Sequence, residues 1–268
     1  FLEQRILISG DSPVIELNIK VMKEDVRSPE AVYFTFPLQL SKGWRCHFDT
    51  AGLPVELDEQ QLPGSCRDWM AVNSFVALHD NDHAVVLYCP EAPLVQVGDF
   101  NFGRQNSAIP RNENPLLLAW PLNNYWDTNF RATQPGLIEL RYYFSAIRKF
   151  DVFDVCQQAS ALSTPLEIHP LISCAENEEK QFIEVNGEKI RVLYVKQAKD
   201  GDGIIIRLLS LNEKSAYNEL AFPNRVIQSA FVCTPHENVL QSLEIENNSV
   251  ILNLYPKCIT TIKVRLSK

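Results

Sequence analysis

With 46% hydrophobic and 22% charged residues, this 268-residue chain has the balance of a folded globular protein and not of a disordered one. Its net charge of −8, without a run of lysine or arginine that could follow a phosphate backbone, argues against nucleic acid as a partner. No apolar stretch approaches the roughly 20 residues that cross a bilayer, so we expect no membrane span.

The beginning of the chain and its cysteines indicate where the protein works. The first residues lack the basic start and apolar core of a signal peptide and also lack an initiating methionine. This start is expected for an excised piece of a longer polypeptide, and a processed mature chain would look the same. Seven widely spaced cysteines without a CxxC pair favour free thiols in a reducing compartment, which predicts a cytoplasmic protein.

In the first half of the chain, the pattern predicts strands. Residues 13–21 and 136–146 alternate apolar and polar side chains, as half-buried strands do. Residues 31–40 are rich in aromatic and β-branched side chains, which fit a pleated surface. Residues 74–89 consist of two apolar runs around the polar sequence HDNDH, which predicts a hairpin.

The second half of the chain also shows a pattern of strands separated by turns. In residues 180–196, Asn186 and Gly187 form the pair most typical of a tight hairpin turn. Residues 201–211 predict a central strand after a turn, and residues 249–268 predict two strands separated by a Pro-Lys break.

One short helix is the exception to this β pattern. Residues 150–163 have the nearest approach to a 3.6-residue period, and we expect a domain boundary near residues 147–165. The chain is therefore predicted to be all-β.

Catalytic signatures are absent from the sequence. No GxGxxG, Walker, HExxH or GxSxG motif occurs. The residues from His79 to His83 contain imidazole and carboxylate groups that metals bind, but their place in a predicted hairpin favours a solvated turn. The residues from Asp200 to Gly203 begin like a calcium loop, but Ile204 and Leu211 stand where ligands are needed, so a turn is again favoured.

Residues 120–130, WPLNNYWDTNF, are the least ordinary stretch of the chain. Aromatic rings can stack on the apolar face of a sugar, and asparagine amides can bond its hydroxyls. The alternative is that the aromatic residues fill a β core while the asparagines close turns. Composition alone favours the core and leaves the sugar surface open.

Three stretches resemble the C-terminal β region of glycoside hydrolase family 38, the α-mannosidases, particularly their bacterial branch. They are SPEAVYFTFPL (28–38), CPEAPLVQVGDFNFG (89–103) and LNNYWDTNFRATQPGLIELRYYFS (122–145). The last is similar to a family block of the form MNNYWxTNF, with Leu122 in place of the methionine. The ending SVILNLYPKCITTIKVRL (249–266) resembles the final strand pair of the family, whereas residues 150–248 are weakly matched.

The resemblance implies a β supersandwich of the galactose mutarotase type over residues 1–148, lacking its opening strands, and a smaller β-sandwich over residues 149–268. It also implies an N-terminal catalytic domain of the same polypeptide, which holds zinc and supplies the aspartate nucleophile of a retaining mechanism. No residue of this chain matches the nucleophile, the acid or a metal ligand, so we expect no catalytic residue, no metal site and no cofactor here.

We therefore expect a non-catalytic C-terminal region that supports the catalytic domain, with an α-mannoside or related sugar as the ligand of the whole. The block in residues 120–130 is then core, a domain contact or a rim of the sugar pocket. The residues that would bond a sugar are Asn123, Asn124, Asp127 and Asn129, with Tyr125 or Trp126 as the platform and Arg104 and Arg111 as lesser candidates. The alternatives are a free-standing carbohydrate-binding β protein and a purely structural β module, and a homo-oligomer stays open.

Overall fold

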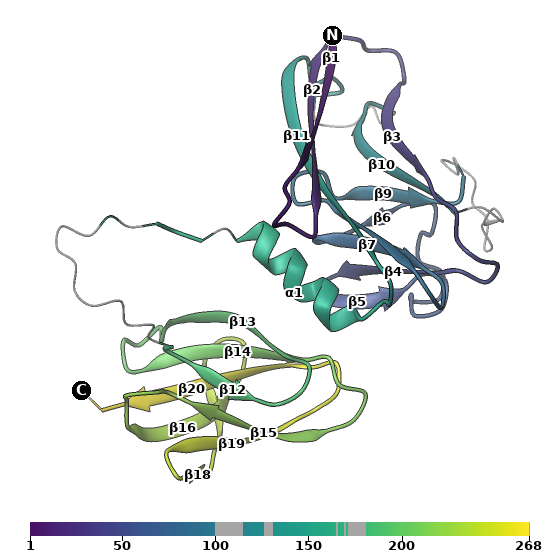
Figure 1. Ribbon diagram of the computed structural model, residues 1–268. Coiled ribbons are helices and arrows are strands. Elements are labelled where there is room, and N and C mark those ends of the chain that lie inside the picture. Colours follow the sequence, from purple (N-terminus) through teal and green to yellow (C-terminus); the bar gives the residue numbers. More distant parts are fainter. Residues whose placement is uncertain (100–114, 126–130, 165, 169, 171–180, 268) are drawn as a thin grey trace. The chain divides into compact units, whose positions relative to one another are not determined.

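The computed structural model describes residues 1–99, 115–125, 131–164, 166–168, 170 and 181–267 (Figure 1). The chain divides into two compact units, Phe1–Leu166 and Glu167–Lys268. Strands dominate both units, and the described residues contain one helix, so the all-β class is confirmed. The division into units falls just after this helix, next to the range 147–165 in which the sequence pattern predicts a boundary, whereas the family resemblance implies a division after residue 148.

The larger sheet of the first unit is antiparallel and has seven strands (Figure 1). The strands are β1 (Leu2–Ile8), β2 (Ile15–Lys23), β4 (Arg45–Thr50), β5 (Leu53–Glu56), β7 (Phe75–His79), β8 (Ala84–Tyr88) and β11 (Gly136–Ile147). Their order is β1-β2-β11-β8-β7-β4-β5. The strands β7 and β8 pair across the predicted hairpin, which is confirmed. In its turn, the Asp80 carboxylate accepts hydrogen bonds from the amides of Asp82 and His83.

The smaller sheet of the first unit has four strands in the order β3-β10-β9-β6. They are β3 (Ala31–Pro37), β6 (Met70–Ala71), β9 (Leu94–Val97) and β10 (Leu116–Asn123). The two sheets share one hydrophobic core, in which Phe34 of β3 meets Tyr142 of β11 edge to face at 6.0 Å. Phe36 and Phe144 make the same contact at 4.6 Å. Offset or edge-on ring pairs of this kind stabilise a sandwich beyond the area that they bury.

Helix α1 (Val152–Ser163) covers part of the larger sheet. The Asp151 carboxylate accepts hydrogen bonds from the amides of Phe153 and Asp154, so it caps the first turn of the helix. The face with Val155, Cys156 and Ala159 is buried, and the helix contacts β8. The predicted helix is therefore confirmed. No helix in the described part of the chain is long and apolar enough to cross a membrane.

The second unit is a smaller sandwich of two antiparallel sheets, in the orders β12-β15-β19-β18 and β13-β14-β20-β16-β17. The strands of the first sheet are β12 (Glu184–Asn186), β15 (Ala216–Ala221), β18 (Ile245–Glu246) and β19 (Ser249–Leu254). Those of the second are β13 (Ile190–Gln197), β14 (Ile204–Ser210), β16 (Ile227–Cys233), β17 (Val239–Ser242) and β20 (Ile259–Leu266). Strand β14 lies inside its sheet, as predicted for residues 201–211, and it follows a turn at Lys199 and Asp200.

The predicted hairpin at Asn186 and Gly187 is wrong. Strand β12 ends at Asn186 and pairs with β15, whereas β13 pairs with β14 in the other sheet. The turn therefore moves the chain from one layer to the other. The local turn signal is real, but which strands pair is decided by the burial of both faces, and that is a non-local property.

Candidate functional site

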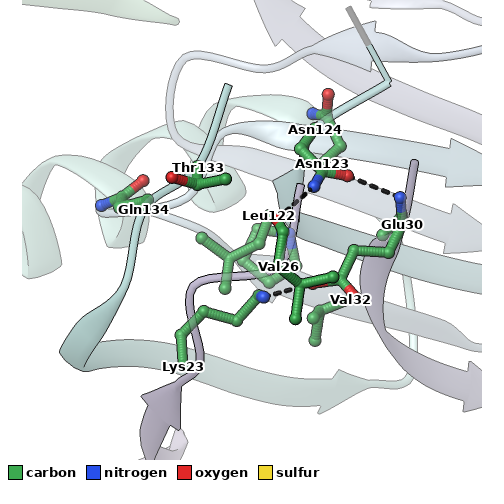
Figure 2. A pocket seen from close by; sticks show the side chains of 11 residues that line it. Lys23, Val26, Glu30, Val32, Leu122, Asn123, Asn124, Thr133 and Gln134 are labelled. Carbon is green, nitrogen blue, oxygen red and sulfur yellow. Dashed lines mark hydrogen bonds and ion pairs between the residues drawn. The ribbon is translucent and has the colours of Figure 1, made fainter. Parts of the chain in front are cut away.

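A pocket of about 210 Å³ lies where strand ends of the first unit meet (Figure 2). The end of β2, the start of β3, the end of β10 and the segment before β11 surround it. The lining residues are Lys23, Val26, Glu30, Ala31, Val32, Pro121, Leu122, Asn123, Asn124, Thr133 and Gln134. The volume is below the roughly 300–1,000 Å³ of pockets for drug-sized ligands, so the pocket suits a small polar group such as part of one sugar unit.

Pro121 explains how β10 delivers its two asparagines to this pocket. Between Ala119 and Leu122 the register of β10 against β3 shifts by a bulge. A proline has no N–H for the ladder, and in strands it is found at such irregularities. A bulge re-aims the side chains that follow it, so Asn123 and Asn124 reach the pocket at the end of the strand.

Asn124 holds the segment between β2 and β3 in place. Its Nδ2 donates hydrogen bonds to the carbonyl oxygens of Val26 at 2.8 Å and Ser28 at 2.9 Å. Its Oδ1 accepts a hydrogen bond from the backbone amide of Glu30, and the backbone amide of Asn124 donates to the Glu30 carbonyl oxygen at 3.0 Å. Both amide hydrogens of the side chain are therefore used within the protein. The turn-closing role that the sequence offered for the asparagines applies to this one.

Charged groups beside the pocket compensate one another. Lys23 forms an ion pair with Glu30, and its Nζ also donates to the Glu24 carbonyl at 3.0 Å. A hydrogen bond from the Thr133 hydroxyl lowers the pKa of Asp25, and the positive charges of Arg131, Arg27 and Lys23 add to this effect, while burial opposes it. The two charged residues among the described lining, Lys23 and Glu30, are therefore paired with each other.

A cluster of aromatic rings surrounds Trp120. Its side chain is 1% exposed, and it stacks on Tyr33 at 5.4 Å. Trp69 meets it edge to face at 5.8 Å, and the ring of Tyr125 lies 6.0 Å away. Burial raises the pKa of Tyr33 to about 12, the nearby Tyr125 adds to the rise, and Gln96 opposes it. Trp120 is thus part of the packing, as the core interpretation of this stretch requires.

The structure divides the residues that the sequence offered for sugar binding. Asn123 and Asn124 line the pocket, whereas Tyr125 lies half-buried beside Trp120 and is not among the lining residues. Five further candidates lie outside the described residues: Arg104, Arg111, Trp126, Asp127 and Asn129. Of the two asparagines, only Asn123 has a side-chain amide without a hydrogen-bond partner in the part of the chain that is described.

Several pocket residues escaped the sequence analysis. Lys23 and Glu30 come from one stretch of the chain, and Thr133 and Gln134 come from another stretch about a hundred residues later. Gln134, like Asn123, has a side-chain amide with no partner among the described residues. No spacing rule singles these residues out, because only the pairing of β2 with β11 and of β3 with β10 brings them together.

A pair of histidines forms a second polar cluster, in the larger sheet. The Nδ1 atom of His47 lies 2.9 Å from the Nε2 atom of His79, and Phe150 stacks on His79 at 4.1 Å. His79 is 1% exposed and belongs to β7. The expectation that it lies in a solvated turn is therefore wrong for this residue. All five residues of β7 are buried, so the buried strand extends one residue into the polar sequence.

The described residues that line the pocket offer hydrogen-bonding groups and a single carboxylate. Hydrolysis with retention needs two carboxyl groups about 5–5.5 Å apart. The one carboxylate among the lining residues, that of Glu30, is paired with Lys23. No group of three or more His, Cys, Asp or Glu side chains in the described ranges is arranged to hold a metal ion. The described lining residues of the pocket therefore do not include such a pair of carboxyl groups.

Comparison with known proteins finds one family model that matches part of the second unit. Residues 189–262 match the model described as glycosyl hydrolases family 38 C-terminal beta sandwich domain. This range lies wholly within the second unit. No curated protein matches the chain.

Solved structures from Enterococcus faecalis have a similar fold. An alpha-mannosidase from strain V583 aligns with a TM-score of 0.68 at 14% identity, over 98% of this chain and 28% of that one. A protein in the glycosyl hydrolase family 38 aligns with a TM-score of 0.69 at 14% identity, over 98% of this chain and 29% of that one. At this identity the likeness shows the fold. The chain spans less than a third of the length of either protein.

Proposed function

Since the chain resembles the C-terminal β region of glycoside hydrolase family 38, we propose that it is the non-catalytic C-terminal region of an α-mannosidase-like enzyme. In this role it supports an N-terminal catalytic domain of the same polypeptide. The reaction of the whole is the retaining hydrolysis of α-mannosides or related sugars. The observation on which this proposal rests is the family match over residues 189–262. In addition, 98% of this chain aligns with the fold of part of an alpha-mannosidase.

We assign the zinc ion and the aspartate nucleophile of the reaction to the N-terminal catalytic domain. The ion pair between Lys23 and Glu30 leaves the described pocket without a free acid for glycosyl transfer. The catalytic domain must therefore supply both carboxyl groups. Six described cysteines are unbridged, which agrees with a cytoplasmic location as part of the proposal.

The contribution of this chain to sugar binding would come from free amides. An amide both donates and accepts, so it can bond two neighbouring hydroxyls of a sugar. Asn123 and Gln134 line the pocket and have side-chain amides without a partner in the described part of the chain. Asn124 is instead a structural residue, because both hydrogens of its amide bond the backbone.

An assay with an aryl α-mannoside tests the proposal. The intact polypeptide should hydrolyse it in a metal-dependent manner, and residues 1–268 alone should not. Turnover by the pure chain, or none by the intact polypeptide, would contradict the proposal.

Single substitutions in the intact enzyme test the sugar contact. Asn123→Ala should raise KM by roughly three- to tenfold, the worth of one neutral hydrogen bond. Asn81→Ala, which changes an exposed asparagine in the turn between β7 and β8, is the matched control and should leave KM unchanged. Equal KM values for the two variants would restrict this chain to scaffolding.

A carbohydrate-binding role without catalysis is the second candidate, and the free amides of Asn123 and Gln134 favour it. It predicts that residues 1–268 bind mannose on their own. Titration with mannose, followed by the amide signals of the pocket in NMR spectra, distinguishes this role from that of a scaffold.

A further inference from the structure

Strand β1 has an apolar face that nothing in the described structure covers. In the ladder with β2, Leu2, Ile6 and Ile8 stand opposite Val21, Leu17 and Ile15. Residues directly opposite each other in an antiparallel pair point to the same face. Leu17 and Val21 pack against the core of the first unit, so the three β1 residues lie on the core face of the sheet.

The hydrophobic core of the first unit covers this face of β2 but does not extend to β1. Residues of β2, such as Ile19, belong to the core, and no residue of β1 does. Leu2, Ile6 and Ile8 are 58%, 65% and 76% exposed, and Ile15 beside them is 41% exposed. We call these four residues the β1 apolar strip. The same face carries one polar residue, Gln4, opposite Ile19, whereas the opposite face carries Glu3 and Arg5 with Leu7, so most of the apolar residues lie on the side where a core would form.

The edge of the sheet is open at the same place. Strand β1 is the last strand of its sheet, and β2 is its sole partner among the described strands. In an antiparallel pair alternate residues direct their N–H and C=O groups away from the partner, so half of these groups in β1 are unpaired. Edge strands normally avoid such pairing by charges, prolines or bulges. An apolar strip beside an unpaired edge is typical of a surface that another strand covers.

We propose that the β1 apolar strip is the docking surface for an apolar β-strand from the remainder of the longer polypeptide. That strand pairs with the edge of β1 and covers Leu2, Ile6 and Ile8. The inference rests on the proposed function, in which the chain is one region of a larger enzyme. The matched proteins contain more than twice as much additional polypeptide as this chain has, since the chain covers 28% and 29% of their lengths. A segment of that remainder is thus available in the same molecule to complete the sheet.

Hydrogen exchange of the intact polypeptide tests the pairing directly. If a strand adds to the edge, the amides of β1 that point away from β2 should exchange at least about tenfold more slowly than those of an open edge strand. Protection that is independent of protein concentration supports the proposal. Protection that appears only with a dimer, seen by light scattering, assigns the strip to a second copy and overturns it. Rapid exchange of these amides at all concentrations overturns it as well.

Two neighbouring substitutions test the cover of the strip. Ile6→Asn places an amide on the covered face, whereas Leu7→Asn makes the same kind of change on the opposite face of the same strand. In the intact polypeptide, Ile6→Asn should lower the melting temperature by at least about 4 °C, and Leu7→Asn by less than half of this. Equal effects of the two substitutions would overturn the proposal.

Hydrolysis of an aryl α-mannoside, measured on the same samples, separates this inference from the proposed function. An active enzyme with an unprotected β1 strand contradicts the docking surface alone. A protected β1 strand in a polypeptide without hydrolase activity contradicts the proposed function alone.

Discussion

The two units share a two-sheet architecture and differ in the side chains that form their hydrophobic cores. Each is a pair of antiparallel sheets around one core. The first core uses aromatic rings from both sheets, including Phe34, Phe48 and Tyr142. The second is almost wholly aliphatic, with Phe222 as the one aromatic residue among its buried members. The first unit also contains the pocket with the free amides, whereas the family match lies in the second. The family-model match and the candidate site thus lie in different units.

Turns differ between the units in the same way. In the first unit the described glycines with positive φ, such as Gly43 and Gly52, have open space where a side chain would lie. In the second unit Gly203 is pressed against β20: an added Cβ would lie 2.6 Å from the Val264 carbonyl oxygen. The ion pair of Lys263 with Asp200 at 2.6 Å holds the same turn on this strand. This turn of the second unit is thus held closely against β20.

The largest effects should come from deleting one buried ring in each unit. Trp120→Ala in the first unit and Phe222→Ala in the second remove side chains that are each 1% exposed. Each change should lower the free energy of unfolding of its own unit by about 3–5 kcal/mol. Calorimetry combined with hydrogen exchange resolved by residue measures both units. If Trp120→Ala weakened both units equally, the comparison of two separate cores would not hold.

The tight turn of the second unit predicts the next largest effect. Gly203 has φ +106, so Gly203→Ala brings both backbone strain and a contact with Val264. We expect a loss of about 3 kcal/mol in the free energy of unfolding, at the upper end for a strained residue. Gly201→Ala is the matched control, because Gly201 has φ +76 but nothing within 4 Å, and about 1 kcal/mol is expected there. If urea titrations gave the same loss of stability for both variants, the backbone at Val264 would have moved to accommodate the added methyl group.

In the first unit, the two asparagines at the pocket should behave differently. Asn124→Ala removes three side-chain hydrogen bonds to the backbone of the segment before β3. It should lower the free energy of unfolding by about 2 kcal/mol, since partly buried backbone groups lose their partners. Asn123→Ala should change it by less than about 0.5 kcal/mol. Urea unfolding of the two variants measures the difference, and a reversed order would exchange their roles.

The sequence predicts the elements of both units better than it predicts their partners. The hairpin of β7 and β8, the long strand β11 and helix α1 follow from patterns within about 15 neighbouring residues. The turn at Asn186 and Gly187 was assigned to the wrong pairing, because the choice of a partner strand depends on a whole buried face. The local pattern determines to which face of a strand a side chain points, whereas the sheet topology determines which residues it contacts.

The pocket shows the same limit. Asn123 and Asn124 stood out as part of an unusual stretch, and the structure places both at the site. Lys23, Glu30 and Gln134 could not be selected in the same way, since each is an ordinary polar residue beside a turn. The different roles of the two asparagines also depend on the carbonyl oxygens that only Asn124 reaches.

The smallest effect should separate the units by pH. Burial lowers the pKa of His79, and the charge of Arg45 adds to this, while the backbone carbonyl and carboxylate of Asp80 oppose it. Below the ordinary histidine pKa of about 6.5, the unfolded chain therefore binds more protons at this position than the folded one, and stability falls as the pH falls. His47 and Phe150 contact the ring, so proton uptake also disturbs their packing.

Urea unfolding between pH 7 and 5 should show this loss in the first unit, to which His79 belongs. His79→Gln should flatten the pH dependence, whereas His83→Gln, a change at a 71% exposed side chain, should preserve it. If His79→Gln kept the full pH dependence, the buried pair would not be its source.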